Sequence, residues 1–190
     1  MNEAEFNQFS KRDRFNRVLE GKAYWAFIAN PKVSDRFKTT TYVVNLGLDE
    51  ANQELAKSYG LKVKPADLSV PMPYVTINRK VKPGINPEEV KPVLIDTSSK
   101  AITDTLLIGN ESTIRVKFGT YWFPNNGGGV GTILQKVQVI NLIPYESKDK
   151  DFISDGSGYT YTEETTKTST TTEGDDFGLE YLEDDSEAIA

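Results

Sequence analysis

Apolar and polar residues alternate along residues 21–145, and this pattern predicts a domain built mainly of β-strands. The clearest case is residues 39–48, where Tyr42, Val44, Leu46 and Leu48 fall on one face and polar or small positions fall between them. Similar runs predict strands over residues 22–29, 70–81, 92–96, 113–123 and 133–145. Two prolines near the start of the 70–81 run favour an edge or a bent entry for that strand.

One short helix is predicted between the second and third strands, over residues 49–60. Asp49 suits the N-cap, Ala51, Leu55 and Tyr59 supply an apolar stripe, and Gly60 suits the first position after the helix. A single short helix among five or six strands favours a five-stranded Greek-key barrel of the OB-fold type, with a β-sandwich as the alternative.

Charge divides the chain into two unequal parts. Residues 1–145 carry 19 Lys and Arg against 14 Asp and Glu, a net charge of +5, whereas residues 146–190 carry 3 against 14, a net charge of −11. Residues 154–174 contain Ser, Thr, Gly and Glu but no Leu, Ile, Val or Met, so they cannot bury enough apolar surface to fold. We therefore expect an N-terminal arm or helix over 1–20, a core over 21–147, a flexible linker over 148–174 and a disordered acidic tail over 175–190.

The tail combines acidic residues with aromatic and apolar ones. A purely solubilising terminus gains nothing from Phe and Tyr, whereas a peptide that binds a basic, apolar groove uses both kinds of contact. The sequence therefore predicts an interaction tail, although a solubilising role is the alternative. Its expected contact residues are Asp175, Asp176, Phe177, Leu179, Tyr181, Leu182, Glu183, Asp184 and Asp185.

Composition also narrows the chemistry. The chain has no Cys and no His, which removes disulfides, thiolate metal sites and every Ser-His-Asp arrangement, so we expect neither catalysis nor a cofactor. The N-terminal residues show no apolar signal segment, and no apolar run is long enough to cross a bilayer. These features predict a protein of the cytoplasm without membrane contact.

Residues 113–123 carry the strongest indication of a binding surface. Ile114, Val116, Phe118 and Trp122 share one parity, and the other parity contains the set Arg115, Lys117, Tyr121 and Phe123. Single-stranded nucleic acid offers a polyanionic backbone and exposed bases, which cations and aromatic rings bind respectively. The second face therefore predicts a surface for single-stranded nucleic acid, with a solvent-exposed amphipathic strand as the alternative.

Further candidates surround that strand. Basic and aromatic residues on the other strands and loops extend the predicted nucleic-acid surface: Lys22, Lys32, Arg36, Phe37, Lys38, Tyr74, Arg79, Lys80 and Lys82. Trp25 and Phe27 are expected in the core, with a role in stacking on bases as the alternative. The glycine-rich residues 127–131 lack the ending of a phosphate-binding loop and predict a flexible hairpin tip.

In the order of its segments, the chain resembles the bacteriophage single-stranded DNA-binding proteins. The resemblance covers roughly residues 20–145 and the tail. Its segments are GKAYWAFIANP, TTTYVVNLGLD before the helix, PVLIDTSS, IGNES leading into TIRVKF, and LQKVQVINLIPY before the acidic end. Relatives are expected to carry a small residue where Glu111 stands.

The resemblance implies an OB-fold that coats single-stranded DNA during phage replication and recombination in the host cytoplasm. It also implies that the acidic tail recruits replisome proteins and competes with DNA for the basic groove. A homo-oligomer is possible on this basis.

Two alternatives remain open from the sequence. One is a β-rich protein-interaction or virion assembly module that does not bind nucleic acid. The other is a nuclease that holds Mg²⁺ with Asp96, Asp104 and Glu111, which no paired acidic motif supports.

Overall fold

A computed structural model describes residues 1–36, 38–102, 106–124 and 127–145. Phe37, the predicted linker and the predicted acidic tail lie outside the described residues. The elements are α1 (Glu3–Asn7), α2 (Lys11–Phe15), β1 (Arg17–Ser34), β2 (Thr39–Gly47), α3 (Glu50–Ser58), β3 (Tyr74–Val81), the 3₁₀ turn η1 (Pro87–Val90), β4 (Val93–Ile95), β5 (Thr113–Phe123) and β6 (Gly129–Asn141).

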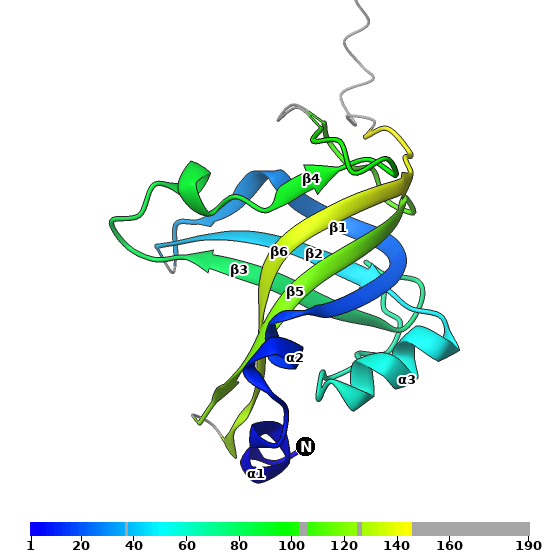
Figure 1. The fold of residues 1–190 in the computed structure, drawn as a ribbon. Helices are drawn as coiled ribbons and strands as arrows, with labels where there is room; N and C mark the ends of the chain where they lie inside the picture. Colours follow the sequence, from blue (N-terminus) through cyan, green and yellow to red (C-terminus); the bar gives the residue numbers. More distant parts are fainter. Residues whose placement is uncertain (37, 103–105, 125–126, 146–190) are drawn as a thin grey trace, which may run out of the picture. The chain divides into compact units, whose positions relative to one another are not determined.

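The strands form one curved sheet in the order β3-β2-β1-β5-β6-β4 (Figure 1). Strands β1 to β3 follow one another as antiparallel neighbours, and β5 returns to pair with β1, which is the Greek-key arrangement. The sheet curls so that β3 contacts β6, and the backbone N–H of Asn78 donates to Thr132 Oγ1 at 3.0 Å. The predicted mainly β Greek-key barrel is confirmed, but the sheet has six strands because the short β4 adds a parallel strand beside β6.

Strand β1 is long enough to join the two halves of the barrel. Residues Arg17–Lys22 pair with β5, and residues from Lys22 onward pair with β2. Gly21 lies at this change of partner, where a Cβ atom would come within 2.2 Å of the Gly47 carbonyl oxygen, so only glycine fits. The strand begins at Arg17, which shortens the separate N-terminal segment that the sequence predicted over 1–20.

The predicted core faces are confirmed where periodicity was clearest. Tyr42, Val44 and Leu46 of β2 are fully buried, as are Ile114, Val116 and Phe118 of β5. Together with Leu19, Ile28, Ile77, Leu134 and Val137 they form the interior of the barrel. The apolar parity that the sequence marked is therefore the face that closes inward.

Helix α3 has the predicted ends but a different packing face. Asp49 caps it by accepting a hydrogen bond from the Asn52 N–H at 2.8 Å, and Gly60 follows it with φ +79°. The predicted apolar stripe was wrong at two of its three residues: Tyr59 packs partly buried against the core, but Ala51 is exposed and Leu55 is 39% exposed, whereas Ala56 is fully buried. The small Ala56 side chain lets the helix lie close to the barrel.

The N-terminal residues form two one-turn helices under the β5–β6 hairpin (Figure 1). Phe6 of α1 is buried, with its ring centroid 6.0 Å from that of Trp122 in β5. At the end of α2, the carbonyl groups of Arg14 and Phe15 accept hydrogen bonds from Thr120 Oγ1 and Gln135 Nε2. The N-terminal segment is thus attached to one side of the hairpin.

The turn before β5 holds a residue in a strained conformation. Glu111 has φ +70°, a left-handed value that favours glycine, and its N–H donates to the Ala23 carbonyl at 2.8 Å. Ser112 Oγ donates to the Gly109 carbonyl at 2.8 Å within the same turn. The position at which a small residue was expected is therefore a tight turn that Glu111 occupies at a conformational cost.

No helix of the described residues is long and apolar enough to span a membrane.

Candidate nucleic-acid interface

The far end of the β5–β6 hairpin pairs aromatic residues with glycines. Tyr121 lies opposite Gly131, and Phe123 lies opposite Gly129. A Cβ atom at Gly131 would lie 2.3 Å from the Tyr121 ring, and one at Gly129 would lie 2.6 Å from the Phe123 ring. Each glycine therefore leaves room for the ring across from it, and the two rings remain 43% and 38% exposed.

This pairing corrects the prediction of a flexible tip for residues 127–131. Strand β6 begins at Gly129, so the last three of these residues belong to the sheet. The rings of Phe123 and Tyr121 on β5 occupy the space where Gly129 and Gly131 have no side chain, which is why a glycine-rich segment forms a regular ladder here.

A groove lies between this hairpin and β3, and we call it the hairpin groove. It consists of two adjoining hollows of about 650 Å³ and about 260 Å³ that share Asn78, Lys80, Tyr121 and Thr132. Its charged and aromatic lining residues are Lys62, Lys64, Arg79, Lys80, Lys82, Glu89, Tyr121 and Phe123. The structure thus brings together the predicted Arg79, Lys80, Lys82, Tyr121 and Phe123, which lie on two separate strands and the loop after β3.

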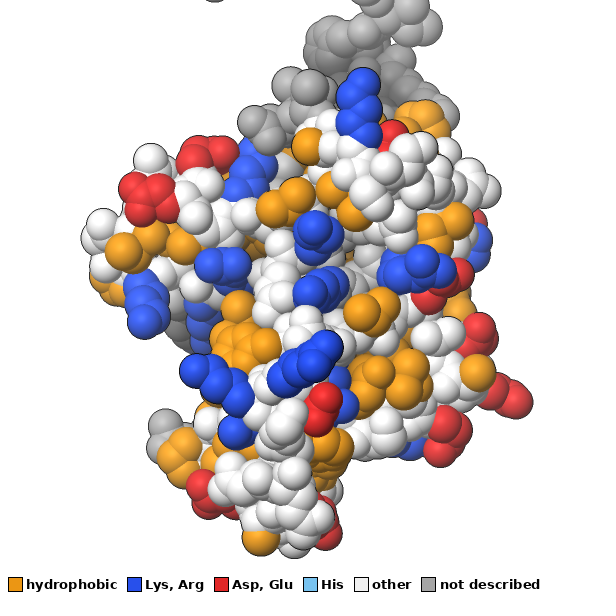
Figure 2. Space-filling model, viewed as in Figure 1, with side chains coloured by type: hydrophobic (Ala, Val, Ile, Leu, Met, Phe, Trp, Pro, Cys, Tyr) orange, Lys and Arg blue, Asp and Glu red, His pale blue; other side chains and the backbone are white. Residues whose placement is uncertain are grey.

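The electrostatics of the groove are dominated by cations. Five Lys and Arg side chains face one carboxylate, that of Glu89. Within the described part of the chain, none of the five lies within salt-bridge distance of an acidic group; Lys64 Nζ instead donates to Thr76 Oγ1 at 2.9 Å. Figure 2 shows Lys and Arg side chains over the middle and left of this view, whereas many acidic ones lie to the right. Cations without acidic partners beside exposed rings suit a polyanion that carries bases.

The basic surface continues along the outer face of β5 and β6. Lys117 lies directly opposite Lys136, and neither has an acidic partner among the described residues. Like charges directly opposite each other destabilise a sheet. An anion bound between Lys117 and Lys136 would remove this repulsion.

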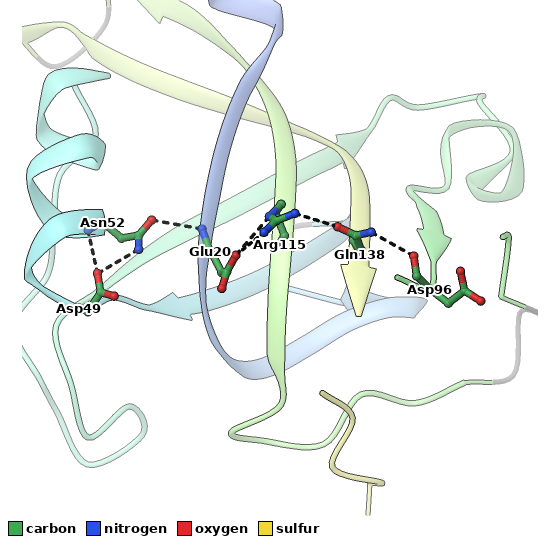
Figure 3. Close-up of polar contacts among 6 residues, drawn as sticks. All are labelled: Glu20, Asp49, Asn52, Asp96, Arg115 and Gln138. Carbon is green, nitrogen blue, oxygen red and sulfur yellow. Dashed lines mark hydrogen bonds and ion pairs between the residues drawn. The ribbon is translucent and has the colours of Figure 1, made fainter. Parts of the chain in front are cut away.

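Arg115 is on the same face, but its guanidinium already contacts Glu20 and Gln138. Its Nη2 atom lies 2.7 Å from Glu20 Oε2, and its Nη1 atom donates to Gln138 Oε1 at 3.3 Å. Gln138 Nε2 in turn donates to the Asp96 carbonyl at 3.1 Å (Figure 3). Arg115 therefore belongs to a polar row across the outer sheet, and its charge is largely neutralised by Glu20.

Two predicted contact residues lie elsewhere. Tyr74 is buried against Tyr24 and Val70, and its hydroxyl donates to Asp67 Oδ2 at 2.7 Å, so the prediction of a stacking role was wrong. This bond, followed by those from the Ser69 and Val70 N–H groups, holds the pKa of Asp67 below its usual value. Lys22 donates to Thr113 Oγ1 at 2.9 Å and lines a hollow with Glu20 and Asp49, apart from the hairpin groove.

The end of β1 and the loop after it carry the remaining predicted cations. Lys32, Arg36 and Lys38 are exposed, and Lys38 has φ +48°. Lys32 lies opposite Thr41 of β2, and Thr41 lies opposite Lys80 of β3, so Lys32 shares the outer face of the sheet with the groove. Phe37 lies outside the described residues.

Sequence reasoning missed three cations of this surface. Lys62 and Lys64 lie in an irregular loop, where no periodicity indicates direction, and Lys136 was not linked to its neighbour Lys117. The core assignment of Trp25 was wrong, because 46% of its surface is exposed, and Phe27 is half-buried. The register of β1 shifts between Tyr24 and Phe27, and this irregularity breaks the parity on which the assignment rested.

The acidic residues proposed for Mg²⁺ have other surroundings. Asp96 Oδ1 accepts a hydrogen bond from the Lys100 N–H at 2.8 Å and so caps a turn. Asp104 lies outside the described residues, among which no group of three or more acidic residues could hold a metal ion.

The chain is similar to solved structures of phage DNA-binding proteins. The gp2.5 single-stranded DNA-binding protein of bacteriophage T7 matches with 18% identity and a TM-score of 0.47, over 77% of this chain and 100% of that one. The single-stranded DNA-binding protein of bacteriophage Enc34 matches with 9% identity and a TM-score of 0.48, over 69% of this chain and 85% of that one. Its complex with single-stranded DNA matches with 9% identity and a TM-score of 0.48, over 68% and 89%. No family model and no curated protein sequence matches the chain.

Proposed function

We propose that this protein binds single-stranded DNA without strong sequence preference and coats it during phage replication and recombination. The observation that carries the proposal is the hairpin groove, in which Tyr121 and Phe123 lie exposed beside five cations. Among the described residues, none of these cations lies within salt-bridge distance of an acidic group. The known single-stranded DNA-binding proteins to which the fold is similar support the same function.

In this proposal the basic and the aromatic side chains bind different parts of the DNA. Lys62, Arg79, Lys80 and Lys82 bind phosphates and release condensed counterions, which gives affinity that falls as salt rises. Tyr121 and Phe123 stack on bases, each base contributing about 1–3 kcal/mol whatever its identity. Neither interaction reads a base edge, so the binding is tolerant of sequence.

The proposal is tested by removing one ring and reversing one charge. Tyr121→Ala and Lys80→Glu should each weaken binding of labelled oligo(dT) by about tenfold or more, as measured by fluorescence anisotropy. Lys57→Glu is the matched control, because it changes the net charge equally but lies on α3, where Lys57 pairs with Glu54. Equal loss in Lys80→Glu and Lys57→Glu would indicate a long-range charge effect instead of a local contact. Unchanged affinity in both Tyr121→Ala and Lys80→Glu would show that the hairpin groove does not bind the DNA.

We further propose the division of labour that the sequence suggests, with residues 148–174 as a linker and 175–190 as the tail. In this view the tail recruits replisome proteins in the host cytoplasm and competes with DNA for the groove. Its acidic and aromatic residues suit both tasks, since they resemble a polyanion with stacking rings.

A protein-interaction or virion assembly module is the second candidate. Exposed apolar side chains such as Leu68 and Tyr145 favour it, since such residues are common in protein contacts. It predicts no binding of oligo(dT) even at low salt, whereas the DNA-binding proposal predicts strong binding under those conditions.

A further inference from the structure

We propose that Trp25 forms a second, rigid stacking site for a nucleobase, on the outer face of the sheet across β2 from the hairpin groove. This inference rests on the proposed binding of single-stranded DNA. It assigns a role to an exposed tryptophan whose left-handed backbone conformation is unfavourable for the stability of the fold.

Trp25 is held in a strained and exposed position. Its φ of +51° is left-handed, which is rare and unfavourable for a bulky side chain. Two hydrogen bonds stabilise it there: the backbone N–H donates to Asn110 Oδ1 at 2.9 Å, and the indole Nε1–H donates to the Ser69 carbonyl at 3.1 Å. Because both N–H groups are bound, the ring is fixed while 46% of the residue's surface stays exposed.

The surroundings of this ring suit a flat aromatic ligand. Trp25, Phe27 and Tyr145 line a hollow of about 260 Å³ together with the amides of Asn30 and Asn110, and we call this hollow the Trp25 pocket. Among the described residues its lining includes no acidic side chain, and the Lys32 ammonium lies 6.0 Å from the centre of the Phe27 ring. Rings for stacking, amides for base edges and a nearby cation for phosphate form a combination typical of nucleotide contacts.

The pairing of the strands connects this pocket with the hairpin groove. Phe27 lies opposite Val43 of β2, and Val43 lies opposite Asn78 of β3, which lines the groove. One row further along, Lys32 and Lys80 lie on either side of Thr41. Adjacent strands are about 4.8 Å apart, so the two surfaces are about 10 Å apart across the sheet. One DNA strand that crosses the three strands can therefore reach both.

The test uses Trp25→Asn, because Asn tolerates the left-handed conformation and replaces the ring, together with its hydrogen bond to the Ser69 carbonyl, by a small amide. We expect an unchanged or slightly raised urea midpoint and an affinity for oligo(dT) about tenfold weaker than that of the wild type. We also expect the loss to shrink with oligonucleotides too short to span both surfaces. Leu55→Ala, an exposed apolar residue on α3, is the control and should bind as the wild type does.

Intrinsic fluorescence gives an independent readout. Stacking of a base on Trp25 should quench the wild-type emission when oligo(dT) is added, and this quench should be absent in Trp25→Asn, which retains Trp122. A variant that binds all lengths with wild-type affinity would overturn the inference while leaving the proposed function intact. A wild type that binds no oligo(dT) would instead refute the proposed function. Quenching by a synthetic peptide of residues 174–190, and not by DNA, would assign the pocket to peptide and also overturn the inference.

Discussion

At the scale of single residues, Arg17 is unusual because its charged side chain is buried and lies against two aromatic rings. Its guanidinium lies between two rings, 4.3 Å from the centre of Phe9 and 4.4 Å from that of Tyr59. The residue is buried, and desolvation lowers its pKa, while its Nε and Nη2 atoms have no hydrogen-bond partner. The two rings therefore supply the stabilisation that hydrogen bonds do not, and they tie the N-terminal segment to α3 and β1.

This stacking predicts a specific intolerance to lysine. Arg17→Lys should lower the free energy of unfolding by about 1–2 kcal/mol, because an ammonium cannot lie flat between two rings. Urea denaturation measures the change, and Arg12→Lys, at an exposed basic position of the same segment, serves as the control. If both variants unfold at the wild-type midpoint, the sandwich contributes nothing to stability.

At the scale of elements, the β5–β6 hairpin depends on glycines that were first interpreted as flexible. Gly129 and Gly131 sit beneath the rings of Phe123 and Tyr121, and a side chain at either position would displace the ring. On the opposite side, Phe6 packs against Trp122. The β5–β6 hairpin thus has an aromatic residue on each face. Trp122 packs against the N-terminal segment, whereas Tyr121 and Phe123 line the hairpin groove.

Gly131→Ala tests this arrangement. The added Cβ would lie 2.3 Å from the Tyr121 ring, so the ring must leave its place and affinity for oligo(dT) should fall about fivefold or more. Gly127→Asn is the comparison, because that glycine has open space around it and a φ of +86° that Asn tolerates. The same anisotropy titration serves for both variants, and equal affinities would show that the position of Tyr121 is unimportant.

Periodicity explains which elements could be predicted. The alternation is clear in β2 and in the first half of β5, so their bounds and inward faces followed from the sequence, and the same parity placed Tyr121 and Phe123 outward. In β5 it is interrupted after Lys117, where the register shifts and both Gly119 and Thr120 are buried. The irregularity in β1 between Tyr24 and Phe27 breaks that rule, which is why Trp25 was assigned to the core. Tyr74 was misassigned because the loop that covers it carries no period of its own.

The groove itself could be predicted only in parts. Its cations come from β3, from the loop after β3 and from the loop between α3 and β3, and no sequence spacing indicates that these segments meet the β5–β6 hairpin. The Greek-key return of β5 beside β1, with β6 curling towards β3, is what brings them together. Long-range pairing of this kind is set by the fold and leaves no local signal.

At the scale of the whole molecule, the opposite charges of the two parts become important. Residues 1–145 carry a net charge of +5, and residues 146–190, the expected linker and tail together, carry −11. The proposed competition follows from these charges, because a polyanionic segment would repel DNA and be attracted to basic groups. Both effects weaken with ionic strength, since the Debye length falls to about 8 Å near physiological salt.

Removal of the tail should therefore strengthen binding at low salt. A variant without residues 174–190 is expected to bind oligo(dT) several-fold more tightly than the full chain at about 50 mM salt, and the difference should shrink as salt is raised. Substituting the tail's acidic residues with their amides in the full-length chain should have the same effect. Unchanged or weaker binding after removal would refute competition between tail and DNA.

The central claim, that the basic and aromatic groove binds single-stranded DNA, is tested most directly by a salt series. Anisotropy of labelled oligo(dT) with the full chain, with duplex of the same length as comparison, gives the affinity at each salt concentration. If the groove binds single-stranded DNA, binding should be tight at low salt and much weaker to duplex. The logarithm of the affinity should fall linearly with the logarithm of the salt concentration, with a slope that corresponds to several neutralised phosphates. No binding of oligo(dT) at the lowest salt, with or without the tail, would contradict it.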